Sequence, residues 1–155
     1  MKTLLITAAL CAPLVAQGGV TATATPYGQD CFNLYATATA PLIGTMCYVS
    51  IQNAPTPITT LSIGSSDSST WYGPLPMSLT PVGMPTCWLL QSNDLTHTNT
   101  VNTFWPNVIM HGIDIPNQNT LLGLSAYVQA VSYAPTINSA GAVTSNGVSL
   151  LIGNQ

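Results

Sequence analysis

The sequence predicts an all-β protein, an antiparallel β-sandwich of the immunoglobulin-like or jelly-roll-like kind with about seven to nine strands. Short segments rich in Val, Ile, Thr and Tyr alternate with clusters of Pro, Gly and Asn. Residues of the first group favour strands, and those of the second group form turns. No segment sustains a helical apolar period for long, and turn signals recur every eight to twelve residues or so, which is typical of a sandwich or barrel.

The chain opens with one positive charge, Lys2, followed by a short apolar stretch that ends in Pro13-Leu14-Val15-Ala16. This three-part pattern predicts a secretory signal peptide over residues 1–16, cleaved to leave Gln17 as the new N-terminus. The stretch is too short for a stable membrane span, so we expect no membrane insertion after cleavage. The protein is therefore expected to be secreted, extracellular or held in the cell envelope.

Residues 17–30 are small, polar and rich in Thr and Ala, which indicates a flexible leader or a first edge strand. Residues 31–155 are expected to form a single β-sandwich domain, with turns at 53–57, 73–76, 116–119 and 138–141. Alternation within Val108–Ile115 would place Ile109, His111, Ile113 and Ile115 inward. The expected strands are Asn33–Thr39, Thr45–Gln52, Thr59–Gly64, Met77–Thr80, Trp88–Ser92, Thr100–Trp105, Val108–Ile115, Leu124–Tyr133 and Val148–Ile152.

Charge is almost absent from the sequence. Lys2 is the only Lys or Arg, and the acidic residues are four Asp, at positions 30, 67, 94 and 114. A protein needs cations to displace counterions from phosphate, so nucleic acids are excluded as partners. A surface of Ser, Thr, Asn and Gln with so little charge repulsion favours self-association or a neutral glycan as partner.

Cys31, Cys47 and Cys87 remain after the signal peptide is removed. The run from Thr45 to Ile51 alternates and places Cys47 on the core face with Val49, where it would act as a small buried hydrophobic residue. We therefore expect a Cys31–Cys87 disulfide in an oxidising compartment, while the other two pairings stay open.

The second half of the chain contains four characteristic stretches, Gly83–Cys87, Ile113–Asn117, Leu122–Gln129 and Thr144–Asn154. In these stretches it resembles a small β-rich domain that recurs in exported proteins of planctomycetes and related bacteria, often at the C-terminus of larger chains. This domain usually has a residue other than Cys where the chain has Cys47, and its Gly-x-Gly-Cys opening is matched only loosely, with Asp30 in place of the second Gly. The resemblance implies an exported β-rich fold and no catalytic residue.

No catalytic or metal-binding motif stands out. His111 and Asp114 are three positions apart on one expected strand and would point to opposite faces. The His and Cys residues lack zinc-ligand spacing, and Asp67 and Asp94 lie in loops without the alternating acids of a calcium loop. We expect no cofactor, no metal and no enzymatic activity.

The aromatic residues Trp71, Tyr72 and Trp105 are the candidate ligand-binding side chains. Exposed aromatic rings flanked by Asn, Gln and Thr can grip a neutral sugar without any charge. The alternative is that these rings fill the core or cover its ends, which is the expectation for Trp88 beside Cys87. The sequence thus predicts a non-catalytic secreted or cell-surface structural or interaction module, or alternatively a carbohydrate-binding or adhesion module.

Overall fold

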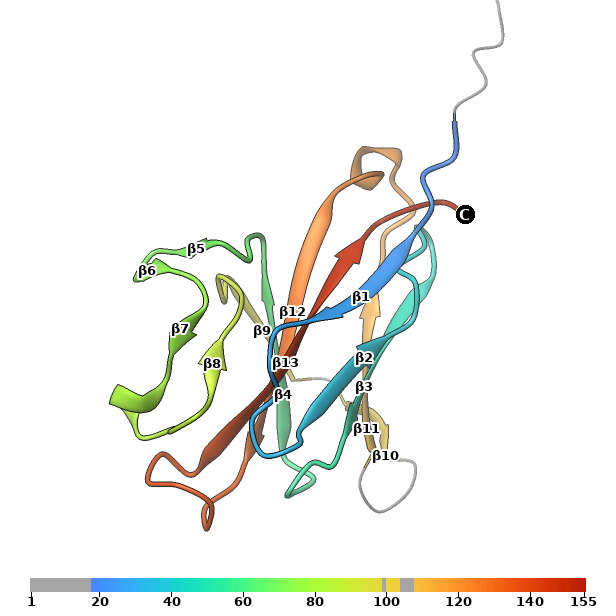
Figure 1. Ribbon diagram of the computed structural model, residues 1–155. Coiled ribbons are helices and arrows are strands. Elements are labelled where there is room, and N and C mark those ends of the chain that lie inside the picture. Colours follow the sequence, from blue (N-terminus) through green and yellow to red (C-terminus); the bar gives the residue numbers. More distant parts are fainter. Residues whose placement is uncertain (1–17, 99, 104–107) are drawn as a thin grey trace, which may run out of the picture.

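The computed structural model describes residues 18–98, 100–103 and 108–155, and its ribbon is drawn in Figure 1. Two antiparallel sheets pack face to face, as the sequence predicted. The first sheet has the strand order β1-β13-β12-β4-β9 and the second β10-β11-β3-β2. The chain crosses from one sheet to the other after β1, β3, β9 and β11.

The strands of the five-stranded sheet are β1 (Thr23–Tyr27), β4 (Thr59–Gly64), β9 (Leu95–His97), β12 (Ser125–Tyr133) and β13 (Ala142–Leu151). Those of the four-stranded sheet are β2 (Tyr35–Ala38), β3 (Met46–Gln52), β10 (Thr100–Thr103) and β11 (Val108–Asp114). Residues 17–30 were expected to form a flexible leader or a first edge strand. The structure places β1, within this range, at an edge of the first sheet.

Two short ribbons accompany the main sheets, so the number of strands exceeds the expected seven to nine. One ribbon pairs β5 (Ser69–Thr70) with β6 (Gly73–Pro74), and the other pairs β7 (Met77–Ser78) with β8 (Trp88–Leu89). The 3-10 helix η1 (Thr80–Val82) connects β7 to β8, and a second, η2 (Asn119–Leu121), precedes β12. The expected strand Met77–Thr80 therefore ends early, where η1 begins.

The core lies between the two sheets and is built by strict alternation. In β3, Cys47, Val49 and Ile51 are fully buried while Met46 and Tyr48 are exposed, as the period of two requires. Leu61 of β4 and Val128 of β12 meet them from the opposite sheet. His111 lies buried beside this core, and its Nε2 is 2.9 Å from Thr59 Oγ1.

A β-bulge changes the alternation in β13. Gln129 of β12 pairs with Gly147 and Val131 pairs with Thr144, so β13 carries one extra residue between these positions. As a result Asn146 points into the sandwich, while Thr144 points away from it. The Asn146 side chain crosses to the edge strand β2, where its Oδ1 accepts from Ala36 N at 2.7 Å and its Nδ2 donates to Ala36 O at 3.0 Å.

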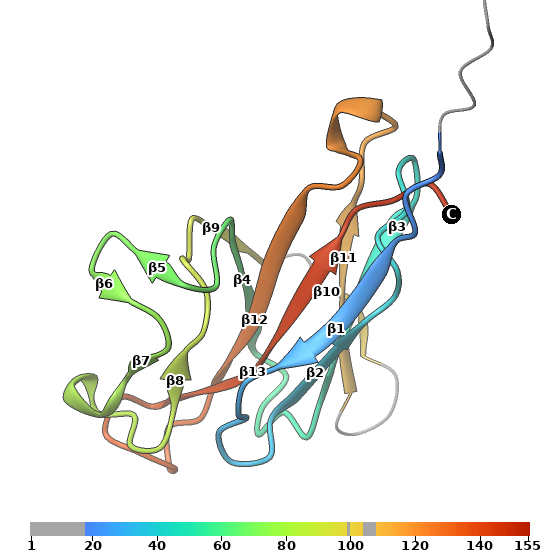
Figure 2. The same cartoon turned by 45° about the horizontal axis from the view of Figure 1, so that its top comes forward.

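Residues 65–92, here named the cap, leave the sandwich after β4 and return before β9. The cap contains β5 to β8 and η1, and Figures 1 and 2 both show it as a separate layer beside β4. It covers part of the outer face of the five-stranded sheet, the face turned away from the four-stranded sheet. The sandwich therefore has a third, partial layer that the strand pattern did not predict.

Candidate functional site

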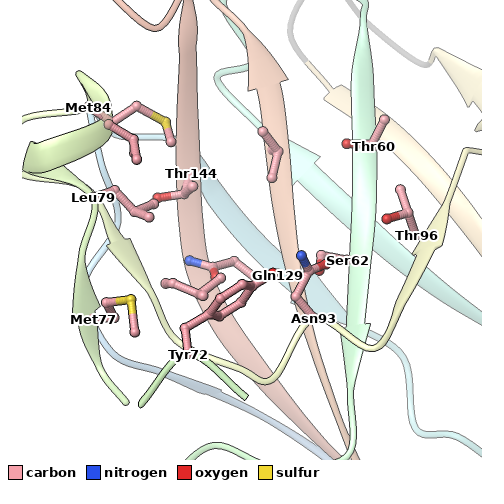
Figure 3. Close-up of a pocket in the computed structure, with 13 residues that line it drawn as sticks. Thr60, Ser62, Tyr72, Met77, Leu79, Met84, Asn93, Thr96, Gln129 and Thr144 are labelled. Atoms are coloured by element: carbon pink, nitrogen blue, oxygen red, sulfur yellow. The ribbon is translucent and has the colours of Figure 1, made fainter. Parts of the chain in front are cut away.

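A pocket of about 450 Å³ lies between the cap and the outer face of the five-stranded sheet. Its two walls differ in chemistry, as the labelled side chains in Figure 3 show. The sheet wall is mostly polar and comprises Thr60, Ser62, Asn93, Thr96, Gln129, Val131 and Thr144. The cap wall is apolar apart from the Tyr72 hydroxyl and comprises Tyr72, Met77, Leu79, Val82, Met84 and Leu89. No residue in either set carries a charge.

Gln129 anchors the cap to the sheet. Its Oε1 accepts a hydrogen bond from Leu90 N at 3.1 Å, and its Nε2 donates to Trp88 O at 2.8 Å and to Ser145 O at 2.7 Å. The side-chain amide thus makes the hydrogen bonds to Leu90 N and Trp88 O that the backbone of a neighbouring strand would make in a sheet. Gln129 points outward from the sheet, yet it is only 1% exposed because the cap covers it.

Two further attachments hold the cap. Cys31 and Cys87 form the expected disulfide, with Cα atoms 5.0 Å apart, and Cys47 remains a free buried thiol. At the η1 end, Gly83 O accepts hydrogen bonds from Ser139 Oγ and from Ala140 N, each at 3.3 Å. The part of the apolar wall between Val82 and Leu89 is therefore held by bonds to other parts of the fold.

Trp71 and Tyr72 form an aromatic platform at the tip of the cap. They are the two turn residues of the β5–β6 hairpin, since Thr70 pairs with Gly73. Trp71 is 83% exposed and Tyr72 is 50% exposed. Their ring centroids lie 3.7 Å apart with the planes tilted by 38°. Tyr72 also lines the pocket, where Figure 3 shows its ring directed toward Gln129, so the platform continues into the pocket.

The other aromatic candidates differ in position. Trp88 is half-buried in β8, where its carbonyl accepts hydrogen bonds from Gln129 and from Thr144 Oγ1. It also borders a second pocket of about 220 Å³ together with Leu90 and Gly28. Trp105 and the expected signal peptide, residues 1–16, lie outside the described residues.

Asp94 braces the loop beside the pocket. Its Oδ2 accepts from Ser65 Oγ at 2.6 Å, from Ser65 N at 2.8 Å and from Ser92 Oγ at 2.8 Å. These donors, the Ser65 hydroxyl first, lower the pKa of the exposed Asp94 carboxyl. The carboxylate is therefore engaged by hydrogen-bond donors rather than directed toward a ligand, and Asp67 lies exposed in the loop after β4.

The His111 and Asp114 side chains point to opposite faces of β11, as predicted. His111 is fully buried and Asp114 is exposed. His97 Nε2 lies 2.9 Å from Gly112 O, which links β9 to the other sheet. Among the described residues, no three His, Cys, Asp or Glu side chains gather where they could hold a metal ion. Within the same residues, no helix has the length and hydropathy of a membrane span.

The sequence pointed to Trp71 and Tyr72 but not to the pocket beneath them. Its floor comes from outward positions of four strands and from Asn93, and its apolar wall comes from Met77, Leu79, Val82, Met84 and Leu89 of the cap. The Met77–Thr80 and Trp88–Ser92 segments were expected to be sandwich strands. The alternation of Ser and Thr with apolar residues in β4 was the available signal for a second buried face, but an ordinary solvent-facing strand has the same pattern.

Comparison with other proteins adds no further assignment to this site. No protein-family model, no curated protein and no solved structure matches the chain. The resemblance to the planctomycete domain therefore stays a prediction.

Proposed function

We propose that this protein is an exported, non-catalytic binding module whose ligand is a neutral glycan held on the Trp71–Tyr72 platform. The observation that carries the proposal is the exposure of Trp71, whose ring is 83% accessible at the tip of a two-residue turn. A Trp side chain in such a position buries little of its surface within its own domain. A partner that covers it would gain the hydrophobic stabilisation that folding leaves unused.

The platform suits the apolar face of a sugar ring. Sugars present C–H groups on their ring faces, and these pack against an aromatic surface without any need for charge. Tyr72 supports Trp71 from one side, since the centroids are 3.7 Å apart, and thereby restricts the orientation of the outer ring. A preorganised ring loses less conformational entropy when the ligand binds.

The lack of charge favours a neutral ligand over an anionic one. The residues that line the pocket are all uncharged, and Lys2 is the only Lys or Arg of the chain. A carboxylated or sulfated glycan would have no cation to meet in this pocket. The disulfide between Cys31 and Cys87 supports export, because such bonds persist in oxidising compartments.

The proposal is tested by titrating the protein with neutral oligosaccharides, for example gluco-, xylo-, manno- and chito-oligosaccharides, while tryptophan emission is recorded. We expect one class to shift the emission, and Trp71→Ala to abolish the shift and weaken binding by about tenfold, as for an aromatic contact of ~1.4 kcal/mol. Tyr48→Ala is the matched control, because Tyr48 is an exposed aromatic on the opposite sheet. Equal losses in the two variants, or no response to any neutral glycan, would contradict the proposal.

A further inference from the structure

Around Gln129, Thr144 and Ser62, the polar floor of the pocket beside the aromatic platform has little free hydrogen-bonding capacity. The Gln129 amide is fully engaged with Leu90 N, Trp88 O and Ser145 O. Thr144 Oγ1 donates to Trp88 O at 3.2 Å. These polar side chains serve the attachment of the cap, so a ligand in the pocket meets atoms whose hydrogen bonds are already made.

The same holds near Asn93 at the other side of the floor. Ser62 Oγ donates to Asn93 Oδ1 and accepts from Gln91 Nε2 at 2.6 Å. Gln91 is fully buried, and its Oε1 accepts from Asn93 N at 2.5 Å. A sugar hydroxyl placed against Ser62 Oγ or Asn93 Oδ1 would give up hydrogen bonds to water for atoms that are already bonded, which costs free energy.

The opposite wall offers apolar contact of a kind that adapts to its ligand. Met77 and Met84 lie on either side of Leu79, with Val82 and Leu89 completing the wall. Methionine side chains are unbranched and polarisable, and they adjust to ligands of varied shape. The volume of about 450 Å³ is in the range of pockets that enclose small molecules.

We infer that the pocket holds an alkyl or acyl chain, and that the ligand as a whole is a glycolipid or a related alkyl glycoside. This inference rests on the proposed function for the sugar part, which Trp71 and Tyr72 hold at the platform. Tyr72 belongs to both the platform and the pocket, so a chain attached to the sugar enters directly between Met77 and Gln129. Both parts of such a ligand are uncharged, in agreement with the lining.

The test is a chain-length series of alkyl β-glucosides, from methyl to octyl, each below its critical micelle concentration and measured by calorimetry. The intact protein should bind about fourfold more tightly for each added methylene, the ratio that corresponds to ~0.8 kcal/mol per buried CH₂. The increase should stop once the chain fills the pocket. An affinity that is the same for the methyl and octyl compounds would overturn the inference.

Two variants link the series to the pocket. Thr60→Trp fills the pocket from the sheet, and Val82→Asp places a charge on the cap wall at a side chain that is 60% exposed, so folding is little disturbed. Each should flatten the dependence on chain length while circular dichroism stays unchanged. Thr37→Trp, at an outward position of β2 on the other sheet, is the matched control and should retain the full dependence. If it flattens the series equally, the chain binds elsewhere and the inference fails.

Free oligosaccharides and plain alkyl alcohols separate this inference from the proposed function. Binding of oligosaccharides that requires Trp71, with no gain from an alkyl chain, would overturn the inference and support the glycan platform. Alcohols that bind as tightly as the glucosides of equal length, and still require an open pocket, would support the alkyl site and overturn the glycan platform. A lack of binding for every compound would overturn both.

Discussion

The Cys31–Cys87 disulfide makes a quantitative prediction about stability. The two residues are separated by 56 positions, and the loop between them includes β2, β3, β4 and most of the cap. In the chain-entropy model, a cross-link that closes a loop of this length removes about 14 cal/mol/K from the unfolded chain, or ~4 kcal/mol at 25 °C. The double variant Cys31→Ser/Cys87→Ser should therefore unfold with a free energy lower by about 4 kcal/mol.

The assay is urea unfolding of the oxidised protein and the double variant, followed by tryptophan fluorescence and by circular dichroism. For a domain of this length, each kcal/mol of unfolding free energy corresponds to about 3–4 °C in Tm. In thermal unfolding, the Tm of the double variant should therefore be lower by ~12–16 °C. A reducing agent should lower the Tm of the unaltered protein to that of the double variant and should not change the Tm of the double variant. The Cys47→Ala variant, which keeps the disulfide, should still respond to the reductant.

A loss of less than ~1 kcal/mol in the double variant would refute the chain-entropy reasoning for this protein. It would mean that the reduced unfolded chain already holds Cys31 and Cys87 close together, or that the native bridge carries compensating strain. Hydrogen exchange adds a local measurement, because residues 65–92 would lose their one covalent attachment and keep only hydrogen bonds and packing, such as the bonds at Gln129 and Gly83. Their amides should exchange faster in the double variant than those of β12 and β13.

Three further predictions concern single side chains. Gln129→Leu leaves the buried Leu90 N and two carbonyls without their partner, so stability should fall by ~2–4 kcal/mol in urea unfolding, whereas Gln118→Leu at an exposed position should be neutral. The pKa of Asp94 is lowered in the folded state, so the contribution of its carboxylate to folding stability is present above about pH 5 and lost as the pH falls through the folded pKa. Asp94→Asn should remove this loss of stability in acid. If stability depends on acid pH in the same way in the variant, the loss does not come from Asp94. Burial raises the pKa of the Tyr27 hydroxyl, which donates a hydrogen bond to Leu90 O. The stability that this hydroxyl contributes should be full below about pH 10 and fall as the pH rises toward the folded pKa. In a plot of Tm against pH, Tyr27→Phe should reduce this fall at alkaline pH.

The central strands were predictable because their alternation is uninterrupted. The expected strand Thr59–Gly64 matches β4, and Thr45–Gln52 differs from β3 by one residue. The free thiol of Cys47 was also predictable, since Cys47 stands in phase with Val49 in a strand of clear period two. In such segments the local pattern and the tertiary contacts require the same conformation.

The first half of β13 was missed because its polar residues are buried. The sequence predicted a strand only over Val148–Ile152, whereas β13 begins at Ala142. Thr144, Ser145 and Asn146 form a polar run typical of a loop, yet each is buried, and the bulge breaks the alternation among them. Their hydrogen bonds are made with distant parts of the chain, such as Ala36, which a local pattern does not record.

The candidate site was predictable only at its rim. Trp71 and Tyr72 stand beside turn residues and drew attention by their type, but the sequence left open whether they fill the core. Leu124 was expected to open the strand Leu124–Tyr133 and is 51% exposed, because β12 begins one residue later. The role of Gln129 depends on contacts with the cap 39 positions or more away, so only the fold reveals it.

The bond from Asn146 to Ala36 has a consequence for how copies of this protein meet. Sheet edges are templates for a strand from another molecule, and many proteins block them with lysines, of which this chain has none beyond position 2. At Ala36 of the edge strand β2, the backbone N–H and C=O are already occupied by the Asn146 amide from the opposite sheet. The edge strand of the five-stranded sheet next to β2 is β1, and it contains Pro26, which has no backbone N–H to donate. Protection from strand-to-strand aggregation is thus built into hydrogen bonding inside the sandwich, where salt and pH have little influence on it.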